Sequence, residues 1–273
     1  MINRIAIVTG ANKGIGFHVA LQLAKSGLFA SLILACRDPM RGQVALEQMQ
    51  RQCNNECKLS CINLTLGNQS SHEAFVKEIT TKFGRVDVLV NNAAIAFKAS
   101  DQTPHEEQAK PTLDVNFRGT LDLTTRLIPL LRKGDDPRVV NVASMAGRLS
   151  QVRSTELRQK LSSPELTISE LCGLVDQYER DVIDGSYHDK GWGGSNYGMS
   201  KLALIAATKV LARNEKGNGI LVNCCCPGYC DTDMSSHKGP RSPIEGAKNA
   251  VLLATTKECF SGEFLQNMKV SEW

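Results

Sequence analysis

The fold of this 273-residue chain is decided by the stretch Thr9-Gly10-Ala11-Asn12-Lys13-Gly14-Ile15-Gly16. It follows Ile5–Val8, an apolar run typical of a buried strand, and it opens a helical pattern that extends to about Ser26. A glycine-rich turn between a strand and a helix is the context in which such a motif predicts a nucleotide site. Glycines let the backbone approach a pyrophosphate, and the free N–H groups of the helix start point at its charge. The Gly-x3-Gly-x-Gly spacing differs from the commoner Gly-x-Gly-x2-Gly, so a plain strand–helix turn is the alternative interpretation.

The second predicted strand, Leu32–Ala35, ends where the ribose of a dinucleotide would lie. An NAD site places an acidic residue there, about 20 residues after the glycines, to bind the ribose hydroxyls. Counting from Gly16, that position is Cys36, and Arg37 follows it. A guanidinium suits a 2′-phosphate, which it binds with paired hydrogen bonds and by stacking. Lys13 adds a second positive charge, so the pattern favours NADPH.

Asp38 is the evidence against that preference, because an acid at this place could serve NADH. Asp38-Pro39 is also a good helix start, with an N-cap acid followed by proline at the first helical position. We interpret Asp38 as a cap and expect NADPH rather than NADH.

Strand and helix patterns alternate along the rest of the chain. Further strands are predicted at residues 58–63, 86–90, 138–144, 220–225 and 262–265. Further helices are predicted at residues 39–52, 69–83, 106–131 and from 242 onwards. This alternation, with no internal repeat and no linker, predicts an α/β fold in one domain, 1–273, built on a single Rossmann-like, doubly wound parallel sheet with helices on both faces.

The alternation pauses before the helix that begins near Tyr197. Thr167-x-x-Glu170 is a capping box that predicts a helix to about Asp184, and a shorter helix is expected at 155–161. We therefore expect a helical insert over about 151–187. A glycine-rich approach, residues 191–195, leads from it to the next helix.

Tyr197 and Lys201 form the chemically most informative pair. Residues four apart lie on the same face of a helix, so the phenol and the ammonium should share one space. A neighbouring cation lowers the pKa of a phenol from about 10, and a phenol tuned in this way can transfer protons at physiological pH. The pair alone is common by chance. Ser144, at the carboxyl end of a predicted strand, and Asn116, an amide inside a predicted helix, are its possible partners.

Composition excludes several classes of protein. The chain is 42% hydrophobic and 22% charged, with a formal net charge of +4 and no concentrated basic block, so we expect no nucleic acid partner. No apolar run reaches the length of a membrane span, and an early first strand leaves no room for a signal peptide. Ten scattered cysteines are typical of reduced thiols in a cytoplasmic protein. Cys53, Cys57 and Cys61 do not have zinc-site spacing, so no metal is expected.

Six motifs in register resemble those of the short-chain dehydrogenase/reductase family. They are Thr9-Gly10-x3-Gly14-x-Gly16, Asn91-Asn92-Ala93, Asn116, Ser144, Tyr197-x3-Lys201 and Pro227-Gly228 with Thr232. The resemblance covers the full chain and is closest to the monomeric NADPH-dependent carbonyl reductases. The long insert, Gly191-Trp192 and the final Trp273 match that branch as well.

The resemblance implies NADPH-dependent reduction of quinones, aldehydes and ketones by hydride transfer, with Tyr197 as proton donor. The implied catalytic residues are Ser144, Tyr197, Lys201 and Asn116, the last holding a water on the proton path. The implied cofactor-binding residues are Gly10, Asn12, Lys13, Gly14, Ile15, Gly16, Arg37, Asn63, Leu64, Asn91, Ala93, Tyr197, Lys201, Pro227, Gly228 and Thr232. The implied substrate-binding residues are Ser144, Ala146, Trp192, Tyr197, Cys226, Tyr229 and Met234.

The resemblance also implies a monomer, because the insert covers the helices through which many family members tetramerise. Cys226 matches a thiol that can meet glutathione, although a packed strand-end cysteine is an equally good interpretation. Three residues depart from the family pattern: Asn63, Ala94 and Tyr229. The alternatives are a hydroxysteroid, prostaglandin or retinoid dehydrogenase of the same fold, or a non-catalytic NADPH-binding regulator.

Overall fold

The structure is a computed structural model that describes residues 4–53, 56–98 and 100–273. Within these ranges the strands form one eight-stranded sheet in the order β3-β2-β1-β4-β5-β6-β7-β8. All neighbouring strands run parallel except β7 and β8, which are antiparallel. The strands are β1 (Ile5–Thr9), β2 (Ser31–Cys36), β3 (Lys58–Asn63), β4 (Val88–Asn91), β5 (Arg138–Val142), β6 (Leu221–Cys225), β7 (Phe264–Gln266) and β8 (Lys269–Val270). The predicted doubly wound parallel sheet is confirmed, and the short antiparallel edge strand β8 is an addition that the sequence pattern did not indicate.

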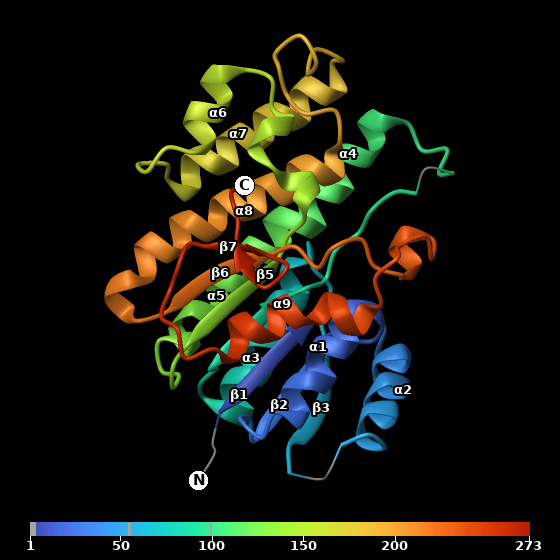
Figure 1. Ribbon diagram of the computed structural model, residues 1–273, viewed down its shortest axis with the longest axis vertical. Helices are drawn as coiled ribbons and strands as arrows, with labels where there is room; N and C mark the ends of the chain where they lie inside the picture. Colours follow the sequence, from blue (N-terminus) through green and yellow to red (C-terminus); the bar gives the residue numbers. More distant parts are fainter. Residues whose placement is uncertain (1–3, 54–55, 99) are drawn as a thin grey trace.

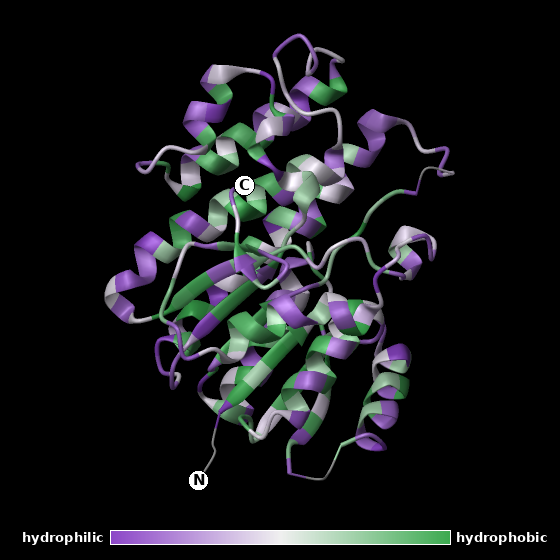
Figure 2. Cartoon of the chain, in the orientation of Figure 1, coloured by the Kyte–Doolittle hydropathy of each residue, from purple (hydrophilic) through white to green (hydrophobic). Residues whose placement is uncertain are grey.

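Helices cover both faces of this sheet (Figure 1). One hydrophobic cluster joins the sheet to α1 (Gly14–Lys25), α2 (Pro39–Gln50) and α9 (Pro243–Thr255). The other joins it to α3 (Gln69–Phe83), α4 (His105–Leu113), α5 (Thr120–Leu131), α7 (Ile168–Ile183) and α8 (Asn196–Glu215). Figure 2 shows the consequence of this layering, since the strands are mostly hydrophobic whereas most outer helices carry polar residues on one side. Among the described residues, no helix combines the length and the apolar character needed to cross a membrane.

The helix predicted over residues 106–131 is interrupted in its middle. A π-helical segment, Asp114–Gly119, lies between α4 and α5 and contains Asn116. The amide side chain of Asn116 leaves the helix and hydrogen-bonds the backbone N–H and C=O of Ile95, at 2.8 and 2.9 Å. Single π-helical turns inside α-helices are frequent at functional sites. The prediction of one continuous helix was therefore wrong at the point where it matters most for the site.

The insert folds as two helices, α6 (Thr155–Leu161) and α7, which lie above α8 in Figure 1. The predicted capping box is present, with the Thr167 hydroxyl accepting from the Glu170 N–H and the Glu170 carboxylate accepting from the Thr167 N–H. Apolar residues of α7 and α8 belong to one buried cluster. The insert thus covers the outer side of α8, and the monomer stays a prediction.

Trp192 is part of this packing, which corrects its predicted place in the substrate pocket. Its side chain is 2% exposed, its ring lies edge-on to Tyr178, and its Nε1 donates to Asp181 at 2.7 Å. Asp181 is itself buried and also accepts from Lys190. Because the indole is enclosed between the insert and α8, Trp192 orients the insert rather than a substrate.

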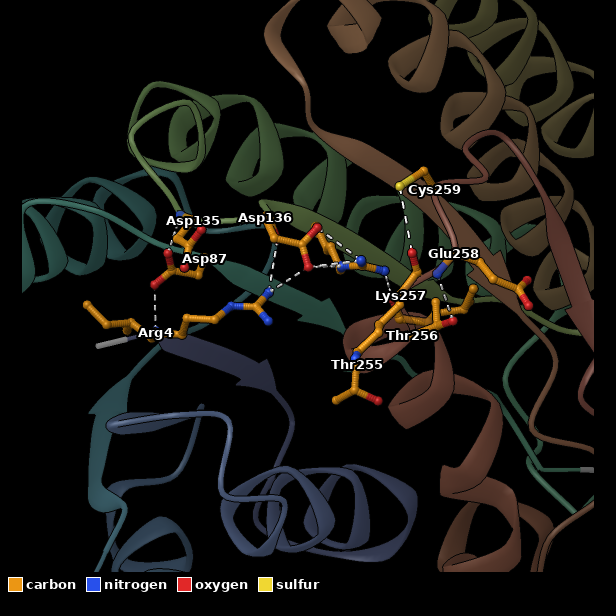
Figure 3. A network of polar contacts seen from close by, with 12 residues as sticks. Arg4, Asp87, Asp135, Asp136, Thr255, Thr256, Lys257, Glu258 and Cys259 are labelled. Atoms are coloured by element: carbon orange, nitrogen blue, oxygen red, sulfur yellow. Dashed lines mark hydrogen bonds and ion pairs between the residues drawn. The ribbon is translucent and has the colours of Figure 1, made fainter. Parts of the chain in front are cut away.

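A separate polar network lies at the amino-terminal ends of the central strands (Figure 3). The Asp87 carboxylate accepts from the backbone N–H groups of Ile5 and Asp135, at 2.6 and 2.5 Å. Buried Arg138 pairs with Asp136 and donates to the carbonyl of Leu253. These bonds satisfy backbone groups at the strand ends opposite the glycine-rich turn. We therefore interpret this network as stabilising the fold rather than as part of the site.

We expect Trp192→Phe to lower the free energy of unfolding by about 1–3 kcal/mol, because the buried Asp181 carboxylate loses a hydrogen-bond donor. Chemical denaturation measures this, with Tyr229→Phe as a control whose ring is 57% exposed. An unchanged stability together with an altered KM for carbonyl compounds would return Trp192 to the substrate pocket.

Candidate active site

The glycine-rich turn lies at the carboxyl end of β1. Its first residue is locked to the next strand by a hydrogen bond from the Gly10 N–H to the Ala35 carbonyl, 2.8 Å long. Gly10 and Gly14 have φ of +64° and +56°, the left-handed region that favours glycine. A Cβ at Gly16 would lie 2.3 Å from Nδ2 of Asn92, so only hydrogen fits there. The sequence spacing is therefore explained by backbone conformation and by close approach.

The turn borders a cleft of about 510 Å³. Its walls come from the ends of β1, β2, β3 and β4, and from the loop that follows β6. Predicted site residues in the lining are Gly10, Asn12, Lys13, Gly14, Ile15, Gly16, Arg37, Leu64, Ala93, Thr232 and Met234. The structure thus brings together most of the predicted cofactor-binding residues, although they come from five separate segments of the chain.

Asn91 is one of the predicted cofactor-binding residues that do not line the cleft. Its side chain is buried below the cleft, where Nδ2 donates to Thr124 and Asn141 at 2.9 and 2.8 Å. The next residue, Asn92, lines the cleft instead and donates to the Thr9 carbonyl at 2.9 Å. Because successive residues of a strand face opposite sides, a one-residue difference separates a core amide from a site amide.

Asn63 is also absent from the lining. It is exposed, and its Nδ2 donates to the Arg37 carbonyl at 2.9 Å, so it supports the end of β2. Asn92 was predicted only as part of the Asn91-Asn92-Ala93 turn. Other lining residues were not predicted as site residues: Thr9, His18, Ala35, Asp38, Arg41, Thr65, Leu66, Ala94, Ile95, Val115, Asp231, Asp233, His237 and Pro243. Arg41 lies one helical turn beyond Arg37, and that spacing is the signal that could have identified it.

The cleft is positively charged at the end of β2. Arg37 is exposed there, and Arg41 reaches Asp38 with Nε 3.3 Å from the carboxylate. Asp38 accepts from the Arg41 N–H at 3.1 Å, which confirms its predicted role as the N-cap of α2. At the opposite wall, Lys13 pairs with Asp233 at 2.5 Å and holds the pKa of that carboxyl below its usual value.

Ser144 and Tyr197 meet beyond the end of β5. Although they are 53 positions apart, the short helical turn Met145–Gly147 after Ser144 packs directly on the backbone of α8. A Cβ at Gly147 would lie 2.6 Å from the backbone carbon of Lys201, and one at Gly198 would lie 2.8 Å from the Ala146 carbonyl oxygen. These two glycines allow the close approach that lets the Ser144 hydroxyl hydrogen-bond Tyr197.

Lys201 lies on the same face of α8 as Tyr197, as predicted. Its Nζ is 5.7 Å from the centre of the tyrosine ring and donates to the Val142 carbonyl at 2.7 Å. Burial lowers the pKa of Lys201 to about 8, against smaller raising effects of Cys225 and Cys226.

Burial raises the pKa of Tyr197 to about 12, opposed by the hydrogen bond with Ser144. The expected net lowering of this pKa is therefore not found, because the pKa of Tyr197 is raised overall. The reason is desolvation, since burial penalises the charged phenolate. Tyr197 is consequently a firmly protonated donor.

Asn116 reaches this group from the π-helical segment. Besides its bonds to Ile95, its Nδ2 donates to the Ser200 hydroxyl at 3.1 Å, and that hydroxyl donates to the Tyr197 carbonyl at 2.8 Å. Asn116 is 1% exposed, so the amide joins the β4 loop to α8 from the inside.

The predicted substrate residues divide into exposed and buried ones. Ala146, Tyr229 and Met234 are exposed near the site, and Pro227-Gly228 leads into the loop that carries the last two. Gly228 has φ of +82°, and the Pro227 carbonyl accepts from Arg241 at 3.1 Å, which fixes the start of the loop. Cys226 is buried, and its sulfur accepts from the N–H groups of Met145 and Gly228, both at 3.3 Å. This favours a packed cysteine over a contact with glutathione.

Comparison with known proteins agrees with this geometry. The family model described as short chain dehydrogenase matches residues 4–155 and 185–242, and the stretch between the matched parts contains α7 and most of α6. Carbonyl reductase [NADPH] 1 of Mus musculus is 39% identical over 98% of both chains. Among solved structures, salutaridine reductase from Papaver somniferum superposes with a TM-score of 0.85 at 30% identity, covering 96% of this chain and 99% of the other.

Menthone neomenthol reductase from Mentha piperita gives a TM-score of 0.82 at 31% identity, covering 97% of this chain and 98% of that one. The glycine-rich cleft, the meeting of Ser144 with Tyr197 and these matches lead to one conclusion: the chain belongs to the short-chain dehydrogenase family.

Proposed function

We propose that this protein reduces carbonyl compounds with NADPH. The observation that carries the proposal is one continuous edge of the sheet, which presents an arginine-lined dinucleotide cleft and, beyond β5, the group formed by Ser144, Tyr197 and Lys201. The relatives named carbonyl reductase [NADPH] support both the cofactor and the reaction class. NADPH, when bound, supplies the hydride.

The residues of the cleft fit this cofactor. Gly10, Gly14 and Gly16 leave the backbone open where any side chain would clash or be strained. The start of α1 directs free N–H groups into the same space, which suits a pyrophosphate. Arg37 and Arg41 at the end of β2 would bind the 2′-phosphate. Thr232 and Ala93 would contact the rest of the dinucleotide.

Two donors would bind the carbonyl oxygen of the substrate. Ser144 and Tyr197 already share a hydrogen bond, so an oxygen placed between them would be within reach of both hydroxyls. Negative charge develops on this oxygen during reduction, and preorganised donors lower the barrier by stabilising it. Tyr197 then transfers its phenolic proton to the oxygen. The high pKa of the phenol keeps that proton available across the physiological range.

Lys201 would stabilise the phenolate left after proton transfer, as the cation beside the ring. Its bond to the Val142 carbonyl holds the ammonium in place without neutralising it. We propose that Asn116 positions this group through Ser200 and Ile95, and that a water bound near it replaces the lost proton. Ala146, Tyr229 and Met234 would contact quinones, aldehydes or ketones at the open side of the site.

Replacing Tyr197 by Phe removes the proton donor but leaves the cleft intact. We expect kcat with menadione or phenanthrenequinone to fall about 10²- to 10⁴-fold, the usual contribution of a general acid. The dissociation constant of NADPH should change less than about threefold. Turnover is followed at 340 nm, and near-normal turnover contradicts the mechanism. If the unmodified protein binds NADPH tightly but is inactive with a broad carbonyl panel, it is a regulator.

Replacing Arg37 by Asp should shift preference from NADPH toward NADH. A carboxylate repels the 2′-phosphate and can accept from ribose hydroxyls, so the ratio of kcat/KM for the two cofactors should change by at least about tenfold, roughly 1.4 kcal/mol. Arg153→Asp, which alters an exposed arginine outside the cleft, is the control. An unchanged ratio in the Arg37 variant contradicts the assignment of the 2′-phosphate site.

The pH dependence should report Lys201. Its pKa of about 8 means that the ammonium is lost as the pH rises through 8, whereas Tyr197 stays protonated to about 12. We therefore expect kcat/KM for NADPH, which reports the free enzyme, to decline above about pH 8. Lys201→Arg, which stays charged, should move this decline to higher pH. A flat profile between pH 7 and 9.5 contradicts the role of the ammonium.

A further inference from the structure

Two thiols lie against each other beneath the cofactor cleft. Cys36 is the last residue of β2, and Cys61 lies on the neighbouring strand β3. In the parallel register Cys36 is opposite Asn63 and Cys61 is opposite Leu34, so the two cysteines share one face of the sheet with an offset of two residues. Cys36 is buried and Cys61 is half-buried.

The two thiols lie side by side beneath α2. The Cys36 thiol donates a hydrogen bond to Cys61. Gly42 of α2 packs on both of them, since a Cβ at this glycine would lie 2.4 Å from Sγ of Cys61 and 3.5 Å from Sγ of Cys36. Because Gly42 has no side chain, it leaves room for both thiols.

The Cys36 sulfur is also connected to the glycine-rich turn. It accepts hydrogen bonds from the backbone N–H groups of Ala11 and Asn12. The next residue in the chain, Arg37, lines the cleft. A change at this sulfur therefore acts on two parts of the dinucleotide site, the turn and the arginine.

The two thiols differ in pKa, with Cys61 as the more reactive one and Cys36 as its partner. The hydrogen bond from Cys36 lowers the pKa of Cys61, against burial, which raises it. The same hydrogen bond, with burial next, raises the pKa of Cys36. A partly exposed thiol that has a lowered pKa and lies beside a second cysteine is the arrangement that peroxides oxidise reversibly.

We propose that Cys36 and Cys61 form a reversible disulfide under peroxide and that this bond weakens NADPH binding. The Cys61 thiolate attacks one oxygen of hydrogen peroxide, the O–O bond breaks, and a sulfenic acid and hydroxide result. The Cys36 sulfur then attacks the Cys61 sulfur and displaces the sulfenic oxygen, which leaves as water with the Cys36 proton, while the hydroxide takes up the proton that Cys61 released. Two thiols and one peroxide thus give one disulfide and two waters.

The strand geometry links the bond to the cofactor site. A strand spacing of about 4.8 Å and a rise of about 3.3 Å per residue place the two Cα atoms about 8 Å apart. Disulfides need about 4.4–6.8 Å, so the end of β2 must move toward β3 when the bond forms. That movement withdraws the sulfur from Ala11 and Asn12 and shifts Arg37. It also strains the disulfide, which makes it easily reduced.

The experiment uses the full chain and follows the covalent bond separately from activity. The reduced protein is treated with a small excess of hydrogen peroxide, quenched with N-ethylmaleimide, and analysed by intact mass and by peptide mapping without reduction. We expect the oxidised protein to carry two fewer maleimide adducts than the equally labelled reduced protein, and to contain a Cys36–Cys61 linkage, both reversed by dithiothreitol before the quench. The dissociation constant of NADPH, measured by fluorescence, should rise at least about tenfold in the oxidised protein. Saturating NADPH should slow the oxidation.

Cys61→Ser should abolish the linkage and make NADPH affinity insensitive to peroxide, whereas Cys259→Ser, at an exposed cysteine, should behave like the unmodified protein. A linkage between other cysteines, or an unchanged NADPH affinity after the Cys36–Cys61 bond has formed, would overturn the inference. The inference rests on the proposed NADPH site. If the reduced protein fails to bind NADPH, the proposed function is wrong, while the mapped linkage still decides whether the disulfide forms.

Discussion

The structure around the site depends on one buried ammonium. Nζ of Lys201 is bonded to the carbonyl of Val142, the last residue of β5, and thereby ties α8 to the carboxyl end of the sheet. With a pKa near 8, keeping this group charged at neutral pH costs about 3 kcal/mol relative to water. The proposed function explains this cost, because the ammonium would stabilise the phenolate of Tyr197 during the reaction. The packing of Gly147 and Gly198 against each other's segments completes the contact and brings Ser144 to Tyr197.

Asn116 extends the same arrangement to β4. The π-helical segment turns its amide inward, where it holds the backbone of Ile95 on one side and Ser200 of α8 on the other. The cofactor cleft and the Ser144–Tyr197 group are therefore joined through hydrogen bonds of a single buried side chain. Displacement of α8 relative to β4 would disturb both, which explains why the helix departs from α-geometry here.

The insert has a structural part in this arrangement as well. Tyr178 of α7 donates to Oδ1 of Asn196 at 2.8 Å, and Nδ2 of Asn196 donates to the His105 carbonyl at 2.8 Å. Asn196 is the first residue of α8 and directly precedes Tyr197. The insert thus fixes the start of the helix that carries the tyrosine, and the enclosed Trp192 fixes the insert.

The sequence by itself determined the alternation of strands and helices, the glycine-rich turn, the caps at Asp38 and Thr167, and the family, because these depend on local periodicity and local backbone conformation. Only the tertiary structure decided that Asn92 rather than Asn91 faces the cleft, that Trp192 is enclosed, and that Cys226 is engaged by backbone N–H groups. Each of these depends on which side of an element is covered by a distant segment. The same holds for Tyr197, whose pKa is raised because desolvation is a property of the folded surroundings and cannot be read from a spacing of four residues.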